Sequence, residues 1–124
     1  MKRITTGSPF EAKLGYSRAV IKGDWCFVSG VTGYDYKTMS MPVHAADQAR
    51  NCLKTIEAVL EQGGFAMADI VRVTYILTDA ALLDDVAPVL AEGLAEVAPA
   101  ATMMIAGLIR PEMLIEIEVT ALRG

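Results

Sequence analysis

The residues of this chain that could do acid–base chemistry lie on one face of a predicted strand near its C-terminal end. Glu116 and Glu118 alternate there with Ile115 and Ile117, so one face of the strand is apolar and the other carries two carboxylates. A carboxylate beside an apolar face is a candidate general base, because burial and nearby charge tune its proton affinity. The alternation is equally consistent with a glutamate in solvent or at a subunit interface, so Glu116 is a candidate on this evidence alone.

Further polar groups lie around the first apolar run of the chain. Tyr16 comes directly before it and could face a ligand or a subunit interface. Ser29 and Gly30 end the run, where a hydroxyl and a backbone N–H could donate hydrogen bonds to a ligand or simply end a strand. Strand alternation would place Arg18 on the same face as Tyr16. Arg18 is therefore a candidate cation for an anionic ligand.

Other kinds of site are not expected. The single histidine, His44, stands near a predicted helix start, where a solvated side chain is the usual reading. The two cysteines, Cys26 and Cys52, fall within apolar patterns and are predicted to be reduced core thiols. One histidine and two cysteines make no zinc set, and no glycine-rich phosphate loop occurs. Neither a metal nor a cofactor is predicted.

Composition narrows the class of protein. The chain has 124 residues, of which 53% are hydrophobic and 21% charged, with a net charge of −4. We expect a single domain over residues 1–124, with more apolar surface than one core can hide, which favours an oligomer. Lysine and arginine are scattered, so a nucleic-acid partner is not expected. No apolar run approaches the roughly 20 residues of a membrane helix, and no signal peptide is visible, so a cytoplasmic location without a membrane partner is expected.

The periodicity of apolar residues predicts an α+β fold with two helices on one face of a mixed sheet. Pro42 is predicted to open the first helix, and Gly63 and Gly64 to end it. Pro88 is tolerable in the second helix if that helix starts near Asp84 or Asp85. The predicted β-β-α-β-α-β-β order comprises a hairpin over 19–30, a loop over 31–41, a helix over 45–62, a strand over 69–77, a helix from about 84, and strands over 102–106 and 113–122.

Taken together, these features resemble the RidA/YjgF family. The resemblance extends from Gly15 to Leu122, and its strength lies in the order and spacing of short matching segments. Those segments are Gly15-Tyr16-Ser17-Arg18-Ala19-Val20, Phe27-Val28-Ser29-Gly30, Gln48 to Asn51, Gly63-Gly64, Asp69-Ile70-Val71, Thr78-Asp79, Pro99-Ala100 and Ile115-Glu116-Ile117-Glu118.

The resemblance implies a chorismate-mutase-like α+β protomer that forms a homotrimer, with small-molecule pockets between subunits. It also implies hydrolysis of reactive 2-imino or enamino acids to 2-oxo acids and ammonia, without metal or cofactor. Carried over by position, Glu116 helps to place the attacking water. Tyr16, Ser29 and Gly30 complete the pocket.

Two departures from the family pattern bear on that activity. The family's arginine after Pro-Ala, which holds the substrate carboxylate, is replaced here by Ala101, and an expected asparagine falls near Ala87. Met103 stands where deaminase members of the family have a small polar or thiol residue, so with Ala101 it makes the expected substrate pocket more apolar, and Thr102 and Met103 are both candidate substrate-binding residues. The predicted substrate is therefore less anionic, or another cation such as Arg18 or Arg110 replaces the anchor.

Other functions stay open at this point. The alternative to an imine or enamine deaminase is a non-catalytic trimer that binds or senses a small apolar or aromatic metabolite, as Ala101 and Met103-Met104 suggest. A chorismate-mutase-type reaction is a third reading by fold analogy alone, and it would need cationic anchors for a dicarboxylate. RNA cleavage, also linked to the family, is the least expected because the chain is acidic and has no basic patch.

Overall fold

The computed structural model describes residues 1–124 and contains six strands, three α-helices and two 3-10 turns. The strands are β1 (Lys2–Ile4), β2 (Ala19–Lys22), β3 (Trp25–Thr32), β4 (Ile70–Leu77), β5 (Ala100–Ile105) and β6 (Ile115–Leu122). The helical segments are α1 (Pro9–Leu14), α2 (Ala45–Gln62), η1 (Met67–Asp69), η2 (Ala80–Leu82) and α3 (Leu83–Leu94).

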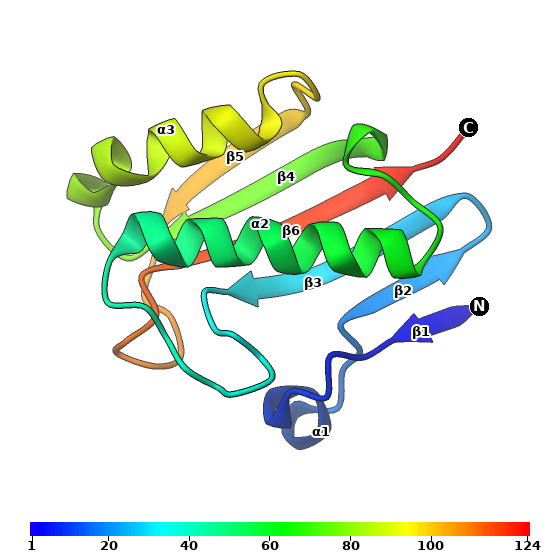
Figure 1. Cartoon of the computed structure of the whole chain (residues 1–124), viewed down its shortest axis with the longest axis horizontal. Coiled ribbons are helices and arrows are strands. Elements are labelled where there is room, and N and C mark those ends of the chain that lie inside the picture. The colour runs from blue at the N-terminus through cyan, green and yellow to red at the C-terminus, as the bar shows by residue number, and fades with distance from the viewer.

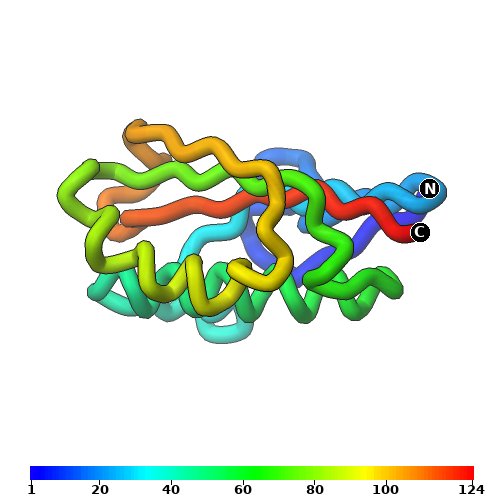
Figure 2. Tube along the Cα trace, turned by 90° about the horizontal axis from the view of Figure 1, so that it is seen from above, coloured from blue at the N-terminus to red at the C-terminus, as the bar shows by residue number.

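All six strands form one mixed sheet in the order β1-β2-β3-β6-β4-β5. Neighbouring strands are antiparallel except β4 and β5, which run parallel and are connected through α3. The helices α2 and α3 lie side by side along the sheet (Figure 1), and an edge-on view places both on the same side of it (Figure 2). The predicted α+β class, mixed sheet and one-sided helical layer are confirmed.

The first eighteen residues hold two elements that the sequence analysis did not predict. The three residues of β1 pair with β2, with Arg3 opposite Val20. The six residues of α1 begin at Pro9, and the Ser8 hydroxyl accepts a hydrogen bond from the Phe10 N–H at 3.2 Å. Both elements are too short to show an apolar period, so only the tertiary contacts define them.

The helix α2 begins later than predicted. Pro42 does not open it: the helix starts at Ala45 after His44, and the Pro42 carbonyl instead accepts a hydrogen bond from the Gln48 side chain at 2.8 Å. The end of α2 is as predicted in location, with Gly64 in the left-handed region (φ +81°).

The helix α3 begins earlier than predicted. The 3-10 turn η2, capped by the Asp79 carboxylate on the Ala81 N–H at 2.8 Å, leads directly into a helix that starts at Leu83. Pro88 therefore lies inside the helix rather than in its first turn.

The main core lies between the sheet and the two helices. Of its 25 buried residues, all but Phe65 lie in β1 to β4, α2, α3 and β6. A smaller cluster of Phe10, Tyr34 and Met113 lies apart from it and joins α1 to the loops that follow β3 and precede β6. The smaller cluster therefore lies where β3 ends and β6 begins.

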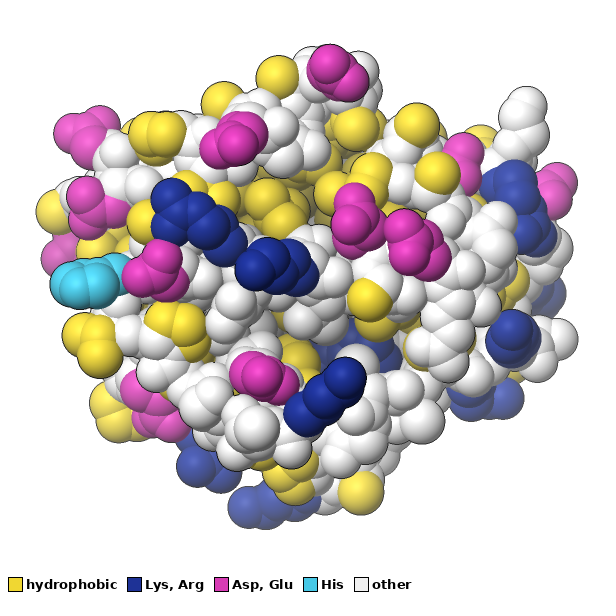
Figure 3. Space-filling view, viewed as in Figure 1, with side chains coloured by type: hydrophobic (Ala, Val, Ile, Leu, Met, Phe, Trp, Pro, Cys, Tyr) yellow, Lys and Arg dark blue, Asp and Glu magenta, His cyan; other side chains and the backbone are white.

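The opposite face of the sheet carries no helix and exposes apolar side chains. Trp25 and Phe27 on β3 are stacked with ring centroids 6.0 Å apart, and they are 43% and 48% exposed. Every residue of the edge strand β5 is exposed, including Met104. Acidic and basic side chains, in contrast, are interspersed over the helical face (Figure 3). None of the helices combines the length and apolarity that crossing a membrane requires.

Candidate functional site

A break in the β3–β6 ladder presents Ser29 and Gly30. The pairing register shifts between Val28 and Val31, so these two residues form an irregularity rather than regular ladder pairs. The Ser29 N–H donates to the Arg18 carbonyl at 2.9 Å, and the Ser29 hydroxyl donates to the Ser17 carbonyl at 2.6 Å. The bulge is thereby tied to the segment that precedes β2.

Glu116 packs its carboxylate against this bulge. It stands on β6 opposite Thr32 of β3 and Ile76 of β4. A β-carbon added at Gly30 would lie 2.6 Å from the Glu116 Oε2 atom, closer than real β-carbons approach a neighbour. Gly30 is therefore required for the carboxylate to occupy this position, and the two predicted site residues are in direct contact.

The environment of Glu116 favours its neutral form. Burial raises the pKa of the carboxyl above the ordinary value of 4.5, the like charge of Glu118 raises it further, and the positive charge of Arg18 opposes both effects. The chain supplies no hydrogen bond or ion pair to the carboxylate. A half-buried carboxylate without a protein partner can accept a proton from a bound water.

Arg18 lies completely buried behind the bulge. Its Nη1 donates to the Gly30 carbonyl at 2.6 Å and more weakly to the Ser29 carbonyl at 3.3 Å. Its guanidinium lies 5.7 Å from the ring centroid of Tyr16 and 5.0 Å from that of Tyr36. The Nε atom has no hydrogen-bond partner.

On the far side of Arg18, Glu11 of α1 completes a charged cluster. Its Oε2 lies 3.8 Å from the Arg18 Nε. Burial would raise the pKa of Glu11, but the hydrogen bonds from Thr5 and Thr6, together with the charge of Arg18, outweigh burial and lower it. Thr5 and Thr6 donate through both hydroxyls and the Thr6 N–H. Glu11 thus fastens α1 to the end of β1 over the arginine.

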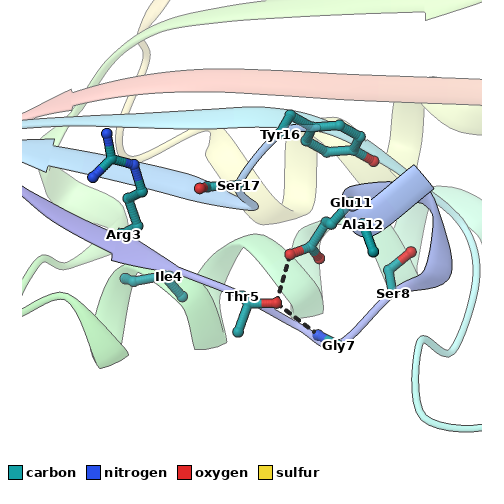
Figure 4. Close-up of a pocket in the computed structure, with 9 residues that line it drawn as sticks. All are labelled: Arg3, Ile4, Thr5, Gly7, Ser8, Glu11, Ala12, Tyr16 and Ser17. Carbon is teal, nitrogen blue, oxygen red and sulfur yellow. Dashed lines mark hydrogen bonds between the residues drawn. The ribbon is translucent and has the colours of Figure 1, made fainter. Parts of the chain in front are cut away.

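Two hollows adjoin this region. One of about 360 Å³ is lined by Arg3, Thr5, Glu11, Tyr16 and neighbouring residues, and Figure 4 shows Glu11 directed toward Thr5 below the Tyr16 ring. The other, of about 300 Å³, lies on the open face and includes Ser29, Arg72 and Glu118. Neither hollow includes Glu116, so neither encloses its carboxylate within one protomer.

Comparison with known proteins agrees with the resemblance. A family model described as Endoribonuclease L-PSP matches residues 6–123 of the chain. A RutC family protein from Pyrococcus horikoshii is 33% identical over 107 residues, which cover 86% of this chain and 85% of that protein. This chain belongs to the RidA/YjgF family.

Two further relatives support this assignment. The crystal structure of a YjgF/YER057c/UK114 family member from Mycobacterium tuberculosis superposes with a TM-score of 0.89 at 35% identity, covering 98% of both chains. An Escherichia coli protein with the name "Putative reactive intermediate deaminase TdcF" is 30% identical over 80 residues, or 64% of this chain and 62% of that one.

The structure brings together five of the residues singled out from the RidA/YjgF resemblance and the sequence. These are Glu116, Gly30, Ser29, Arg18 and Tyr16, which connect through the contacts described above.

Three other candidates lie elsewhere in the protomer. Thr102 pairs with Thr74, which also pairs with Glu118, so it lies in a neighbouring row of the open face. Met103 pairs with the buried Tyr75 and belongs to the opposite face from Glu116. Arg110 lies 4.9 Å from the ring centroid of Phe10, in the loop before β6.

Gln48 and Gly33 are positioning residues that the sequence analysis missed. Gln48 is buried on α2, although it is a polar residue. Its amide NH2 donates to the Pro42 carbonyl and to the Glu112 carbonyl at 3.0 Å, and its amide oxygen accepts from the Leu114 N–H at 2.9 Å. A β-carbon at Gly33 would lie 2.6 Å from the Gln48 Cα. The only signal in the sequence is a lone glutamine one position before the apolar Ala49.

The predicted core role of the cysteines is confirmed. Cys26 and Cys52 are both free and buried, and the Cys52 thiol donates to the Val31 carbonyl at 3.2 Å. Burial raises the pKa of both thiols, so neither is activated as a nucleophile. His44 is exposed at the start of α2. The chain has no group of three or more His, Cys, Asp or Glu side chains that could hold a metal ion.

Proposed function

We propose that this chain hydrolyses reactive imines or enamines to carbonyl compounds and ammonia, in a cleft completed by neighbouring subunits. The observation that carries the proposal is the Glu116 carboxylate, which is half-buried, unpartnered and in contact with Gly30. The name of the TdcF relative, a reactive intermediate deaminase, supports the same reaction class.

In this reaction Glu116 orients a water molecule toward the carbon of the C=N bond. As the C–O bond forms, the carboxylate takes a proton from the water and then passes it to the nitrogen, which gives a carbinolamine and restores the carboxylate. Transfer of the remaining hydroxyl proton to nitrogen, with cleavage of the C–N bond, releases ammonia and leaves the carbonyl product. Tyr16, Ser29 and Gly30 border the carboxylate and are proposed to contact the substrate.

The substrate is proposed to be less anionic than a 2-imino acid. Ala101 offers no charge where the family's arginine would hold a carboxylate, and a hydrogen bond to a charged group contributes about 1.5–3 kcal/mol. Loss of a bidentate contact therefore weakens binding of an anionic substrate by roughly two orders of magnitude. Thr102 and Met103 lie on opposite faces of the exposed strand β5, so Thr102 would give a polar wall on one side of the strand and Met103 an apolar wall on the other.

A homotrimer is proposed because one protomer leaves its site open. Ala101 pairs with the buried Val73, so it belongs to the face opposite Glu116, and these two positions can meet only across a subunit boundary. The exposed apolar side chains of the open sheet face and of β5 are the surface that sister subunits would cover. The cytoplasmic location expected from the sequence stays a prediction.

Release of ammonia from an uncharged imine, generated in situ by an amine oxidase, tests the reaction. We expect wild-type protein to accelerate it, and Glu116→Ala to lose about 100-fold or more of the acceleration. Glu118→Gln, two residues along the same strand face, is the matched control and should retain activity. A wild-type rate equal to both the uncatalysed rate and that of Glu116→Ala would overturn the proposal.

A comparison of two substrates that differ in charge tests the consequence of having Ala101 in place of the family's arginine. We expect an uncharged imine to be preferred over a 2-imino acid of similar size. Ala101→Arg should reverse that preference by improving kcat/KM for the anionic substrate about tenfold or more. An unchanged preference in a folded Ala101→Arg protein would contradict the proposed place of this position in the cleft.

The second candidate function is a non-catalytic binder of a small apolar or aromatic metabolite. The exposed methionines Met103 and Met104, together with the uncharged Ala101, favour it. A thermal-shift screen of metabolites distinguishes the two functions, because tight binding without ammonia release supports the binder. The absence of any thermal response would count against it.

A further inference from the structure

We propose that Arg18 is the buried counter-charge of the Glu116 site, which holds the Ser29–Gly30 bulge in shape and acts on that carboxylate across the bulge without binding the substrate. The inference concerns the charge state of the residue on which the proposed function rests, and its test does not require turnover.

The geometry of Arg18 argues against a direct contact with substrate. The side chain is fully buried, and two tyrosine rings, those of Tyr16 and Tyr36, lie within 5.7 Å of its guanidinium. Its Nη1 is already engaged by the carbonyl groups of the bulge. A carboxylate anchor needs two accessible N–H groups in a plane, which this arrangement does not present.

Arg18 and Glu116 meet the same glycine from opposite sides. Nη1 of Arg18 holds the Gly30 carbonyl at 2.6 Å, and the Glu116 carboxylate packs where a Gly30 side chain would project. No ion pair within 4 Å joins the two charges, so they interact through space across the bulge. Because Arg18 is buried, its charge is screened less by water than that of an exposed arginine.

No other cation faces Glu116. Glu118 on the same strand is a like charge, and Cys52 on α2 is a protonated thiol. The residues paired with Glu116 are Thr32 on β3 and Ile76 on β4, which carry no charge. Burial and Glu118 raise the pKa of Glu116, and Arg18 is the charge that lowers it. Without Arg18 the pKa of the carboxyl would rise further, which would leave less of the ionised base.

Glu11 limits how far the charge of Arg18 lowers the pKa of Glu116. Its carboxylate lies on the other side of the guanidinium, 3.8 Å from Nε, and neutralises part of the positive charge. The cluster therefore runs from Glu11 through Arg18 to Glu116, and the first carboxylate moderates what the arginine does to the second. Removing the charge of Glu11 should lower the pKa of the Glu116 carboxyl, whereas removing the charge of Arg18 should raise it.

The test is a pH titration of the Glu116 side-chain carboxyl, followed by ¹³C NMR in wild-type protein and four variants. We expect Arg18→Lys, which keeps the charge, to titrate close to wild type. Arg18→Gln should raise the midpoint by about one pH unit, a tenfold change in protonation. Arg50→Gln removes an exposed arginine on α2 and should leave the midpoint unchanged.

Two outcomes would overturn the proposal. The first is a folded Arg18→Gln protein whose Glu116 midpoint equals that of wild type. Where Arg18→Gln fails to fold, Glu11→Gln provides the second test, and a midpoint that does not fall in this variant is the second overturning result. Failure of ammonia release in wild type would count against the proposed function alone, because the titration reads the charge state directly.

Discussion

At the scale of single residues, the site depends on the absence of one side chain. Gly30 allows the Glu116 carboxylate to lie directly against the backbone of β3, and Arg18 approaches the same residue through its carbonyl. The glycine is required for space and not for backbone conformation, since it is not among the glycines with positive φ. This predicts that even a methyl group at Gly30 will disturb the site.

Gly30→Ala should displace the Glu116 carboxylate and lower kcat/KM for imine hydrolysis about tenfold or more, because misplaced catalytic groups are costly. Gly107→Ala is the matched control, since a β-carbon there would meet no atom within 4 Å. Steady-state kinetics together with a thermal melt check the prediction. Equal kinetics for Gly30→Ala and Gly107→Ala would contradict it.

Glu116→Gln should make the protein more stable at neutral pH. The folded state raises the pKa of this carboxyl, so its ionisation opposes folding, and the cost appears as pH rises through the folded pKa. The gain in Tm should therefore be present at pH 7 and vanish at a pH below the ordinary value of 4.5. Glu57→Gln, on the exposed side of α2, is the control and should show no such dependence. A Tm gain that persists unchanged at low pH would refute this account.

At the scale of elements, α2 positions two loops that meet where β3 ends and β6 begins. Gln48 joins the segment before α2 to the loop before β6 through its single amide group. The Tyr34 hydroxyl reinforces the same junction by donating to Glu112 at 2.7 Å. Burial raises the pKa of that hydroxyl to about 12, so it stays protonated and remains a donor throughout the neutral range.

Gln48→Ala should destabilise the protein by roughly 2–4 kcal/mol, because three hydrogen bonds are lost and buried backbone groups are left without partners. Gln62→Ala, at the exposed end of α2, should cost far less. Urea denaturation measures both variants. A small effect of Gln48→Ala, equal to that of Gln62→Ala, would show that water replaces the amide without loss.

At the scale of the whole molecule, one face of the sheet is closed by helices and the other is open. The open face combines the stacked Trp25 and Phe27 with the exposed Met104 of β5, and clustered apolar side chains of this kind mark interaction surfaces. The same face holds Glu116. Subunits that cover the open face would therefore also complete the site around Glu116.

Phe27→Glu should dissociate the proposed trimer, because it places a charge at the centre of the open face. Light scattering should give a mass of three chains for wild type and of one chain for the variant. Leu83→Glu, at an equally exposed apolar position on the start of α3, should remain trimeric. A monomeric wild type at micromolar concentration, or a trimeric Phe27→Glu protein, would contradict the proposed assembly.

The sequence by itself determined the elements that are long enough to show a period. The apolar stripe of α2, the alternation of β6 and the turn between β2 and β3 each follow from local chemistry, and their order identified the family resemblance. The sequence also indicated Glu116, Ser29 and Gly30 as site residues, because Glu116 alternates with apolar residues in a strand and Ser29 and Gly30 end an apolar run.

Only the tertiary structure decided how those elements meet. The short elements β1 and α1, the buried Gln48 and the cover of two tyrosines over Arg18 all depend on contacts between residues distant in the chain. Alternation assigned Arg18 to a surface that could face a ligand, but Arg18 lies before β2 begins, where no alternation applies. Its burial shows why charge in a sequence does not reveal its role: a charge's effect depends on the groups and solvent around it, and folding sets both.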